Sequence, residues 1–395
     1  MLSSILILAG ALLSLIVLMI IHEFGHFIIA KKFGIRVDEF GIGYPPRLFG
    51  KKMGDTIYSI NLIPLGAFVR IYGEEGLDAK SSREAGDSVL GVEDVKSFTS
   101  LKIWKRVLII IGGVAAFWLA AIIIFSVVFA TGADLPIGDQ DVPGMTNARV
   151  IISQVSSGSP AQIAGMEFGD VVVLLGSLTN EGGTEIIKVE KVKDFQDFTK
   201  KYEGEQVIAT VQRNGQTLEL QFSPRVSPPD GQGAVGVGLE RIASLIEKYP
   251  WYIAPIKGIS YTWQVTVSSL VGLYSIFANI GGGKGLPAGA EFAGPLGITV
   301  FLANAASYGL GFFLYFIGAI AVFIAIFNLF PIPALDGGKL VFLLIEKVRG
   351  RPVSAKVEQI ITVSFFIVLI CLSLFITIRF DIPRFVDFIK VSLQK

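Results

Sequence analysis

Residues 22–26 of this chain read His22-Glu23-Phe24-Gly25-His26, and they lie inside the apolar stretch 2–30. No other side chain in that stretch is ionisable, and the chain has no histidine outside these five residues, which we call the pentad. Each ionisable side chain at the centre of a membrane-spanning helix costs about 3 kcal/mol. Three of them within five residues therefore indicate a compensating partner, and a bound metal ion would supply one.

The spacing within the pentad is typical of a helical metal site. Residues four apart lie on the same face of a helix, so His22 and His26 should point the same way. Two neutral imidazoles at this spacing can bind Zn²⁺, and Glu23 is then placed to take a proton from a water on that metal. The alternative is a polar packing cluster or a proton relay in a transporter, because His-Glu-x-x-His strings also arise by chance.

The composition is that of a membrane protein. Charged residues make up 17% of the 395 residues, against about 25% in soluble domains, and the mean hydropathy is +0.63. The net charge of +1 gives no information about nucleic-acid binding, and no basic run interleaved with aromatic residues suggests it, so we expect no nucleic-acid partner. Cys371 is the only cysteine, which excludes a disulfide framework and a thiolate metal site.

Apolar runs predict about four membrane-spanning helices, at residues 2–30, 107–130, 309–329 and 360–378. About 20 apolar residues are enough to cross a bilayer. After the first run, residues 55–73 are β-prone but interrupted by Pro64 and Gly66, as expected of a hairpin lying against the membrane. The predicted fold class is a polytopic α-helical membrane protein with a membrane-associated β-hairpin and an inserted α+β domain.

Shifts in composition predict four parts of the chain. They are an N-terminal membrane core at 1–133, a water-soluble domain at 134–240, an amphipathic interfacial helix and linker at 241–290, and a C-terminal membrane core at 291–395. The last part begins with an uncharged segment that is too long for one span and is broken by Gly294-Pro295. We therefore expect a re-entrant piece before the third span, covered by protein or lining a water-filled cavity.

Lysine and arginine predict the orientation. Lys31, Lys32, Lys105 and Arg106 flank the first two spans on one side, and the loop near 347–351 adds more basic residues after the third span. Basic loops face the cytoplasm, so we expect the water-soluble domain outside and the pentad near the cytoplasmic side. The basic residues of the C-terminal tail run against this rule.

Two histidines do not complete a catalytic zinc site, which usually has three protein ligands. The best candidate for the third is Asp336, which ends the third span at the same depth as His22 and His26 and is followed by two glycines. Asn328 lies about two helical turns before it. Its amide could donate a hydrogen bond to a carbonyl oxygen.

The pentad, together with Asn-x-x-Pro-x-Pro-x-Leu-Asp-Gly-Gly at 328–338, resembles the site-2 protease family of intramembrane zinc metalloproteases. The bacterial regulator-of-sigma-E protease type is the nearest match, and the order of parts fits along nearly the whole chain. The resemblance implies that Glu23 is the general base and acid, that His22, His26 and Asp336 bind Zn²⁺, and that Asn328 orients the substrate or stabilises the oxyanion.

The same resemblance implies the substrates and the location. We expect an endopeptidase of the bacterial inner membrane that cleaves transmembrane segments of single-pass proteins already trimmed outside, such as an anti-sigma factor or a remnant signal peptide. The hairpin would present substrate as a strand near Ile60, Asn61 and Leu62. The sequence carries no signal for an oligomeric state.

The water-soluble domain resembles a PDZ domain. Residues 159–170 read Ser-Pro-Ala-Gln-Ile-Ala-Gly-Met-Glu-Phe-Gly-Asp, similar to the Ser-Pro-Ala…Ala-Gly…Gly-Asp signature, in a single copy. In the circularly permuted bacterial form the peptide-binding strand comes last, which implies a site at Gly236, Val237 and Gly238. PDZ domains bind an extended peptide by adding it to a sheet edge.

One motif departs from the family pattern. Relatives usually carry Gly-Pro-x-x-Asn in the second span, where this chain has Gly113-Val114-Ala115-Ala116-Phe117. We transfer no role to Val114 or Phe117.

The rival function is a non-proteolytic membrane protein, either a metal transporter or a PDZ scaffold with a vestigial metal site. A transporter would need more ligands along a path than this one cluster offers.

Overall fold

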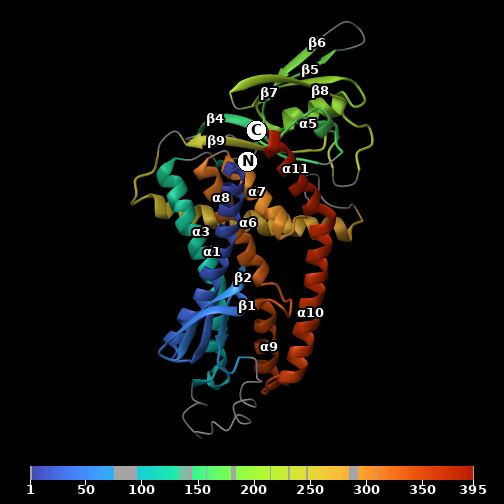
Figure 1. Cartoon of the computed structure of the whole chain (residues 1–395). Helices are drawn as coiled ribbons and strands as arrows, with labels where there is room; N and C mark the ends of the chain where they lie inside the picture. The colour runs from blue at the N-terminus through green and yellow to red at the C-terminus, as the bar shows by residue number, and fades with distance from the viewer. Residues whose placement is uncertain are drawn as a thin grey trace.

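The computed structural model describes residues 2–74, 96–132, 135–136, 139, 145–156, 158–178, 184–213, 215–229, 232–245, 248–283, 292–307 and 309–394. Long helices form the middle of the molecule, a small sheet lies beside their lower half, and a larger sheet covers their upper end (Figure 1). The N- and C-terminal ends both lie at the upper end, near the larger sheet.

Five described helices are long and apolar enough to cross a membrane, so the chain is a multi-pass membrane protein. Four of them match the four predicted spans: α1 (Leu2–Lys32), α3 (Ile103–Thr131), α8 (Leu310–Asn328) and α10 (Ala355–Ile376). The fifth, α6 (Ala254–Gly281), falls in the region predicted as an interfacial helix and is the least apolar of the five.

Helix α6 differs from the other four in direction. It runs across the bundle in Figure 1, whereas α1, α3 and α10 run along it, and it packs against α3 and α8. Its aromatic side chains Trp263 and Tyr274, and Trp251 just before it, are exposed. Aromatic rings of this kind favour the membrane interface. The interfacial position stays a prediction, and residues 284–290 of the predicted linker lie outside the described residues.

Helices α1 and α3 approach each other closely because glycines meet at their crossing. A Cβ atom added to Gly25 would lie 2.3 Å from the carbonyl oxygen of Gly112. Small residues allow such backbone contact, which is a common way for helices to pack within membranes. The crossing explains the glycine of the pentad and brings the middle of α3 against the two histidines.

The small sheet consists of β1 (Val37–Met53) and β2 (Thr56–Ile71), which fold back on themselves. Residues 39–42 of β1 have partners in both halves of β2, for example Gly41 with Ser59 and with Phe68. The second half of β1 pairs with the first half of β2 only. Among the described residues, 67–71 therefore have a strand on one side alone and form an edge of this sheet.

Three shorter helices complete the membrane part. They are α7 (Pro295–Ser307), α9 (Asp336–Arg349) and α11 (Ile382–Gln394), with a π-helical turn, η3 (Thr377–Asp381), joining α10 to α11. The short α7 lies where the sequence predicts a re-entrant piece. Its start is fixed by the fully buried Asp381, whose carboxylate accepts a hydrogen bond from Gly294 N at 3.0 Å. Arg106 of α3 holds α9 through a paired ion contact with Glu346.

The larger sheet belongs to an inserted domain, in the part of the chain predicted to be water-soluble, and has the strand order β3-β9-β4-β5-β7-β8, with β6 on β5. Its strands are β3 (Leu135–Pro136), β4 (Met145–Val155), β5 (Val171–Leu178), β6 (Thr184–Lys188), β7 (Val207–Arg213), β8 (Gln216–Phe222) and β9 (Val237–Leu245). Helices α4 (Pro160–Ile163) and α5 (Val192–Lys201) pack on it around a core that includes Phe195 and Phe198. Strand β9 continues past the predicted domain end at residue 240.

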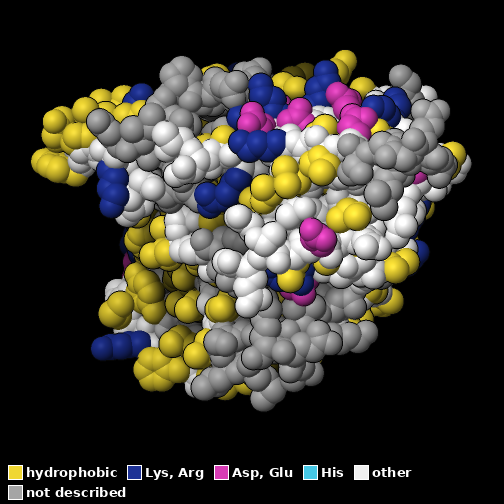
Figure 2. Space-filling view, turned by 90° about the horizontal axis from the view of Figure 1, so that it is seen from above, with side chains coloured by type: hydrophobic (Ala, Val, Ile, Leu, Met, Phe, Trp, Pro, Cys, Tyr) yellow, Lys and Arg dark blue, Asp and Glu magenta, His cyan; other side chains and the backbone are white. Residues whose placement is uncertain are grey.

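This domain rests on the membrane helices. Ile151 of β4 and Ile242 of β9 form a buried cluster with Ala305 of α7 and Phe312 of α8. Seen from above, Lys and Arg side chains lie next to Asp and Glu side chains on the outward surface (Figure 2). The domain is therefore apolar towards the bundle and carries mixed charge towards the solvent.

Candidate metal centre

The structure brings His22, His26 and Asp336 together. His22 Nε2 and His26 Nε2 lie 3.2 Å apart, and each lies 3.3 Å from Asp336 Oδ2. The histidines are in the last third of α1, and the aspartate is the first residue of α9. Three potential ligand atoms, more than three hundred residues apart in the sequence, thus form one small triangle.

The triangle has the size that a zinc ion requires. Zinc binds nitrogen and oxygen ligands at about 2.0–2.1 Å in tetrahedral geometry, which places ligand atoms about 3.3 Å from one another. Asp336 Oδ2 is buried and has no hydrogen-bond partner among the described residues, although two histidine nitrogens lie beside it. A shared cation satisfies this oxygen and both imidazoles at once, so the donor set fits the metal.

The backbone of α3 orients His26. Its Nδ1 lies 2.9 Å from the carbonyl oxygen of Ile109, which can only accept, so Nδ1 carries the proton and Nε2 is free to bind a metal. Gly113, one turn further along α3, leaves room for the ring. A Cβ atom there would lie 2.2 Å from His26 Nε2.

His22 is held differently. Its ring stacks on the ring of Phe117, with centroids 4.7 Å apart and planes 21° from parallel. Its Nδ1 atom is buried and has no hydrogen-bond partner among the described residues. The orientation of the His22 ring therefore depends on contact with the Phe117 ring, whereas the orientation of the His26 ring depends on a hydrogen bond.

The loop between α8 and α9 turns Asp336 towards α1. Pro331 and Pro333 cannot continue α8, which ends at Asn328. Gly337 and Gly338 then let α9 begin against this loop, since Cβ atoms at these positions would lie 2.1 Å from Phe330 O and 2.3 Å from Ile332 O. The glycine pair is needed for close backbone packing beside the aspartate.

Glu23 lies close enough to both histidines, to Asp336 and to Lys339 for their charges to interact. Lys339, one turn into α9, forms an ion pair of 2.6 Å with Glu74 just after β2. The small sheet is thereby tied to the helix that carries Asp336. Tyr44 of β1 lies near enough to Glu23 to interact with its charge. Burial, and then that charge, raise the pKa of the Tyr44 phenol.

Asn328 is the last residue of α8 and is half-buried. Its side chain makes no hydrogen bond to the residues that the structure describes. Asn328 precedes Asp336 by eight residues, as in the motif. It makes no direct hydrogen bond to the candidate metal ligands.

The predicted substrate residues of the hairpin lie at the start of β2. Ile60 and Leu62 are exposed, whereas Asn61 is buried and donates a hydrogen bond to Gly43 O at 3.1 Å. Ile60 pairs with both Ile42 and Phe49, so its backbone has a strand on each side. Gly66 lies against α1 three residues before the pentad, since a Cβ atom there would lie 2.9 Å from Cε of Met19.

Gly236, Val237 and Gly238 lie at the start of β9, beside the Ser-Pro-Ala turn. Gly236 adopts a φ of +75°, and a Cβ atom would lie 2.4 Å from Cβ of Ser159. Val237 and Gly238 pair with β4, and β3 pairs only with Ile242 and Ala243. The edge of β9 over residues 237–241 therefore lacks a partner strand among the described residues, and α5 lies against β9.

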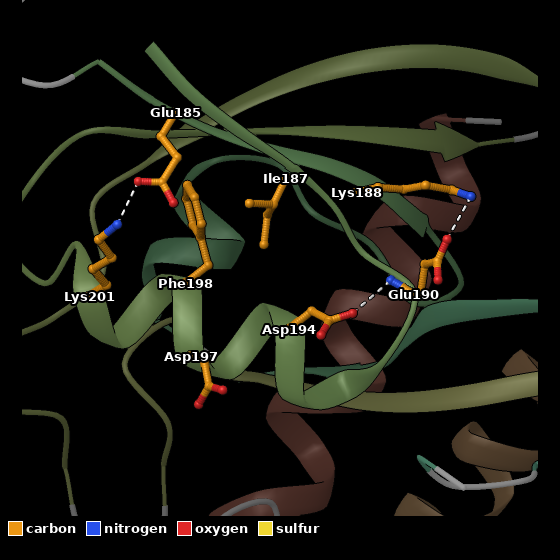
Figure 3. A pocket seen from close by; sticks show the side chains of 8 residues that line it. All are labelled: Glu185, Ile187, Lys188, Glu190, Asp194, Asp197, Phe198 and Lys201. Atoms are coloured by element: carbon orange, nitrogen blue, oxygen red, sulfur yellow. Dashed lines mark hydrogen bonds and ion pairs between the residues drawn. The ribbon is translucent and has the colours of Figure 1, made fainter. Parts of the chain in front are cut away.

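A shallow pocket lies elsewhere, between β6 and α5 of the larger sheet (Figure 3). Glu185, Lys188, Glu190 and Lys201 line it with paired charges, and Phe198 forms part of its floor. It contains no histidine and lies in the upper domain, away from the triangle of ligand atoms. We assign the chemistry to the membrane site.

Three contributors to the site are missing from the sequence-based set: the carbonyl of Ile109, Gly113 and Phe117. They lie four residues apart on one face of α3. Two signals were available: the family motif position at 113–117, to which no role was transferred, and the pair Gly112-Gly113, since glycine inside a helix often marks close packing. Nothing in the sequence pointed to Ile109 or indicated that Phe117 meets a histidine.

Comparison with known proteins places the chain in a family. Residues 10–372 match peptidase family M50. A protein of Nostoc sp., provisionally named a zinc metalloprotease, is 28% identical over 94% of each chain. One of Clostridium perfringens with the same provisional name is 30% identical over 93% of this chain and 96% of its own. Zinc metalloprotease RasP of Shouchella clausii is 27% identical over 91% of this chain and 95% of its own. The chain therefore belongs to peptidase family M50, the site-2 protease family, and its cofactor is Zn²⁺.

Proposed function

We propose that the chain is an intramembrane zinc endopeptidase that cleaves transmembrane segments of single-pass membrane proteins. The observation that carries this proposal is the triangle of His22 Nε2, His26 Nε2 and Asp336 Oδ2, with Glu23 beside it. His26 lies six residues before Lys32, the last residue of α1, which is about 9 Å along a helix axis. The site is thus inside the apolar part of the helix and close to its basic end.

The roles of the residues follow from their chemistry. His22, His26 and Asp336 would hold Zn²⁺, which acts as a Lewis acid and lowers the pKa of a bound water to about 7. Glu23 would accept the proton of the attacking water and later deliver it to the leaving amine. Asn328 can donate from its amide to the oxygen on which negative charge develops.

A helical substrate has to unwind before cleavage, because its carbonyl groups are otherwise occupied by backbone hydrogen bonds. Pairing with an edge strand would hold it extended. Ile60 has a strand on each side, so we assign this task to the edge at 67–71, which follows Gly66 beside Met19. Lys339 and Glu74 fasten the end of this strand to α9.

The substrate would be a protein already trimmed outside the membrane, such as an anti-sigma factor or a remnant signal peptide in a bacterial inner membrane. The larger sheet and its helices would form an extracytoplasmic PDZ domain, with its peptide-binding edge at Gly236, Val237 and Gly238. This domain lies over the end of the bundle opposite the small sheet (Figure 1). A domain at that place would admit a short external segment and exclude a bulky folded one.

The test compares the wild-type protein with Glu23→Gln on a single-span substrate in detergent, each with and without a zinc chelator. Gln keeps the shape of Glu23 and removes its proton-accepting charge. We expect cleavage by the wild type alone, a loss of at least a hundredfold in Glu23→Gln because general-base catalysis contributes about 10²–10⁴-fold, and unchanged zinc content in the variant. Equal cleavage in all conditions would exclude the proposal.

A further inference from the structure

The two histidines of the site differ in what fixes their rings. His26 Nδ1 donates a hydrogen bond of 2.9 Å to Ile109 O, which sets both the tautomer and the ring plane. His22 Nδ1 is buried and finds no acceptor among the described residues. A metal-binding imidazole normally relies on such an acceptor, so something else must hold His22.

Phe117 is the side chain in that position. Its ring lies against the His22 ring at 4.7 Å between centroids, with an angle of 21° between the planes. It is 1% exposed, and it belongs to the core that joins α3 to α8. Its ring is therefore enclosed by the core and presents a flat surface to the imidazole.

The contact between Phe117 and His22 follows from the way α1 and α3 are aligned. On α3, Gly113 faces His26 and Phe117 follows four residues later. On α1, His22 precedes His26 by four residues, and the helices run antiparallel at this crossing. One face of α3 therefore meets both ligands, and each imidazole receives its own support one turn from the other.

We propose that Phe117 is a positioning residue for the metal site: its ring fixes the plane of the His22 imidazole so that Nε2 points at His26 Nε2 and Asp336 Oδ2. The torsion that turns an imidazole about its bond to Cβ is intrinsically broad. Stacking against this enclosed ring restricts it before the metal binds. This inference rests on the proposed function only in taking His22 as a metal ligand.

The competing explanation is that Phe117 is ordinary core packing. The chain offers a matched control in Phe125, which is two turns further along α3 and fully buried. Phe125 packs edge-on against Tyr261 and touches no histidine. Phe117→Leu and Phe125→Leu therefore remove equivalent volume from the same helix, and only the first removes a ring from the site.

The experiment measures zinc affinity of the purified full-length protein in detergent by competition with a chelator, and records the visible spectrum of the cobalt-substituted form. We expect Phe117→Leu to weaken zinc binding about tenfold, in the range for residues that support metal ligands, and to shift the cobalt bands. Phe125→Leu should lower the melting temperature and leave both readouts as in the wild type. Phe117→Tyr, which keeps the ring, should restore the affinity.

Two results would overturn the inference. They are equal losses of zinc affinity in the two leucine variants, or a wild-type affinity and cobalt spectrum in Phe117→Leu. His22→Ala separates this failure from failure of the proposed function. If His22→Ala binds zinc as the wild type does, the ligand assignment itself is wrong. If it loses zinc while Phe117→Leu does not, only the positioning role fails.

Discussion

Single residues set the distances in the candidate metal site. Gly113 has the strictest size limit, because a larger residue would collide with a histidine ring. Gly113 presents a hydrogen atom to the imidazole of His26, where a Cβ atom would approach Nε2 to 2.2 Å. That nitrogen is the atom proposed to bind zinc. A single added methyl group therefore acts on the ligand itself, although Gly113 has no chemistry of its own.

We predict that Gly113→Ala lowers zinc affinity by about ten- to a hundredfold, the range seen when support of a metal ligand is lost. Overpacking should also cost about 1–3 kcal/mol of stability. Chelator competition and thermal unfolding measure the two effects. Gly10→Ala on α1 is the control, because a Cβ atom there meets nothing within 4 Å. Unchanged zinc binding in Gly113→Ala would contradict the placement of His26.

For single residues, the sequence identified candidate site residues where an ionisable side chain lies in an apolar stretch. His22, Glu23 and His26 were evident as the only ionisable residues of a lipid-soluble stretch, and the structure brings the two histidines to Asp336. Ile109 contributes a backbone oxygen, which every residue has. Its role could not be predicted from residue type.

Among single elements, α5 shows how a helix is fixed by a residue far away in the chain. Its first turn has unpaired N–H groups, as every helix has. The Asp139 carboxylate accepts from Val192 N at 2.7 Å and from Lys193 N at 2.8 Å. Asp139 comes from the segment after α3, so this contact ties the entry of the domain to the helix beside β9.

Removing this cap should loosen α5 locally. We predict that Asp139→Ala destabilises the helix by about 1 kcal/mol, as loss of an N-terminal cap does. Amide hydrogen exchange at Val192 and Lys193 should become faster. Asp197→Ala is the matched control, since this side chain is exposed on the same helix (Figure 3) and lies outside its first turn. Equal exchange in the two variants would show that Asp139 does not cap α5.

Elements were predicted well where their pattern is local. Four of the five long apolar helices were predicted from hydropathy, and the hairpin from its β-prone residues. The pairing inside β1 and β2 was not predictable. Residues 39–42 find partners in both halves of β2, and which strand lies between two others depends on contacts that the local pattern does not contain.

The whole molecule depends on how the inserted domain meets the bundle, and this contact contains a carboxyl group. Glu240 of β9 faces Tyr261 of α6 and Tyr315 of α8. Its Oε2 atom is buried and has no hydrogen-bond partner among the described residues. Burial raises the pKa of Glu240 from 4.5 to about 7.

A raised carboxyl pKa makes the folded protein less stable as the pH rises. Below about pH 4.5 the Glu240 carboxyl is protonated in both the folded and the unfolded state and has no effect on stability. Between pH 4.5 and 7 it ionises only in the unfolded state, so stability falls until the pH passes the folded pKa. We predict that Glu240→Gln stabilises the protein by about 1–3 kcal/mol at pH 8 and has little effect near pH 4.5. Melting temperatures across this range test it. A constant difference between the variants would contradict the burial of Glu240.

By itself, the sequence determined the membrane class and the zinc cofactor, and it predicted the residues that would bind the metal. Charges in lipid are costly enough to need a purpose, and apolar runs of sufficient length have to span or lie in a membrane. It also placed Asp336 at the depth of the histidines, because depth follows from position along a span. These inferences depend on composition and distance along the chain.

Only the tertiary structure decided what surrounds the metal site. Periodicity shows which residues share a face of α3, but the rotation of that face towards α1 is set by the contact of Gly25 with Gly112. This contact places Ile109 against His26 and Phe117 against His22. Small residues at the crossing allow this close packing, and it brings an apolar stretch of α3 against both histidines.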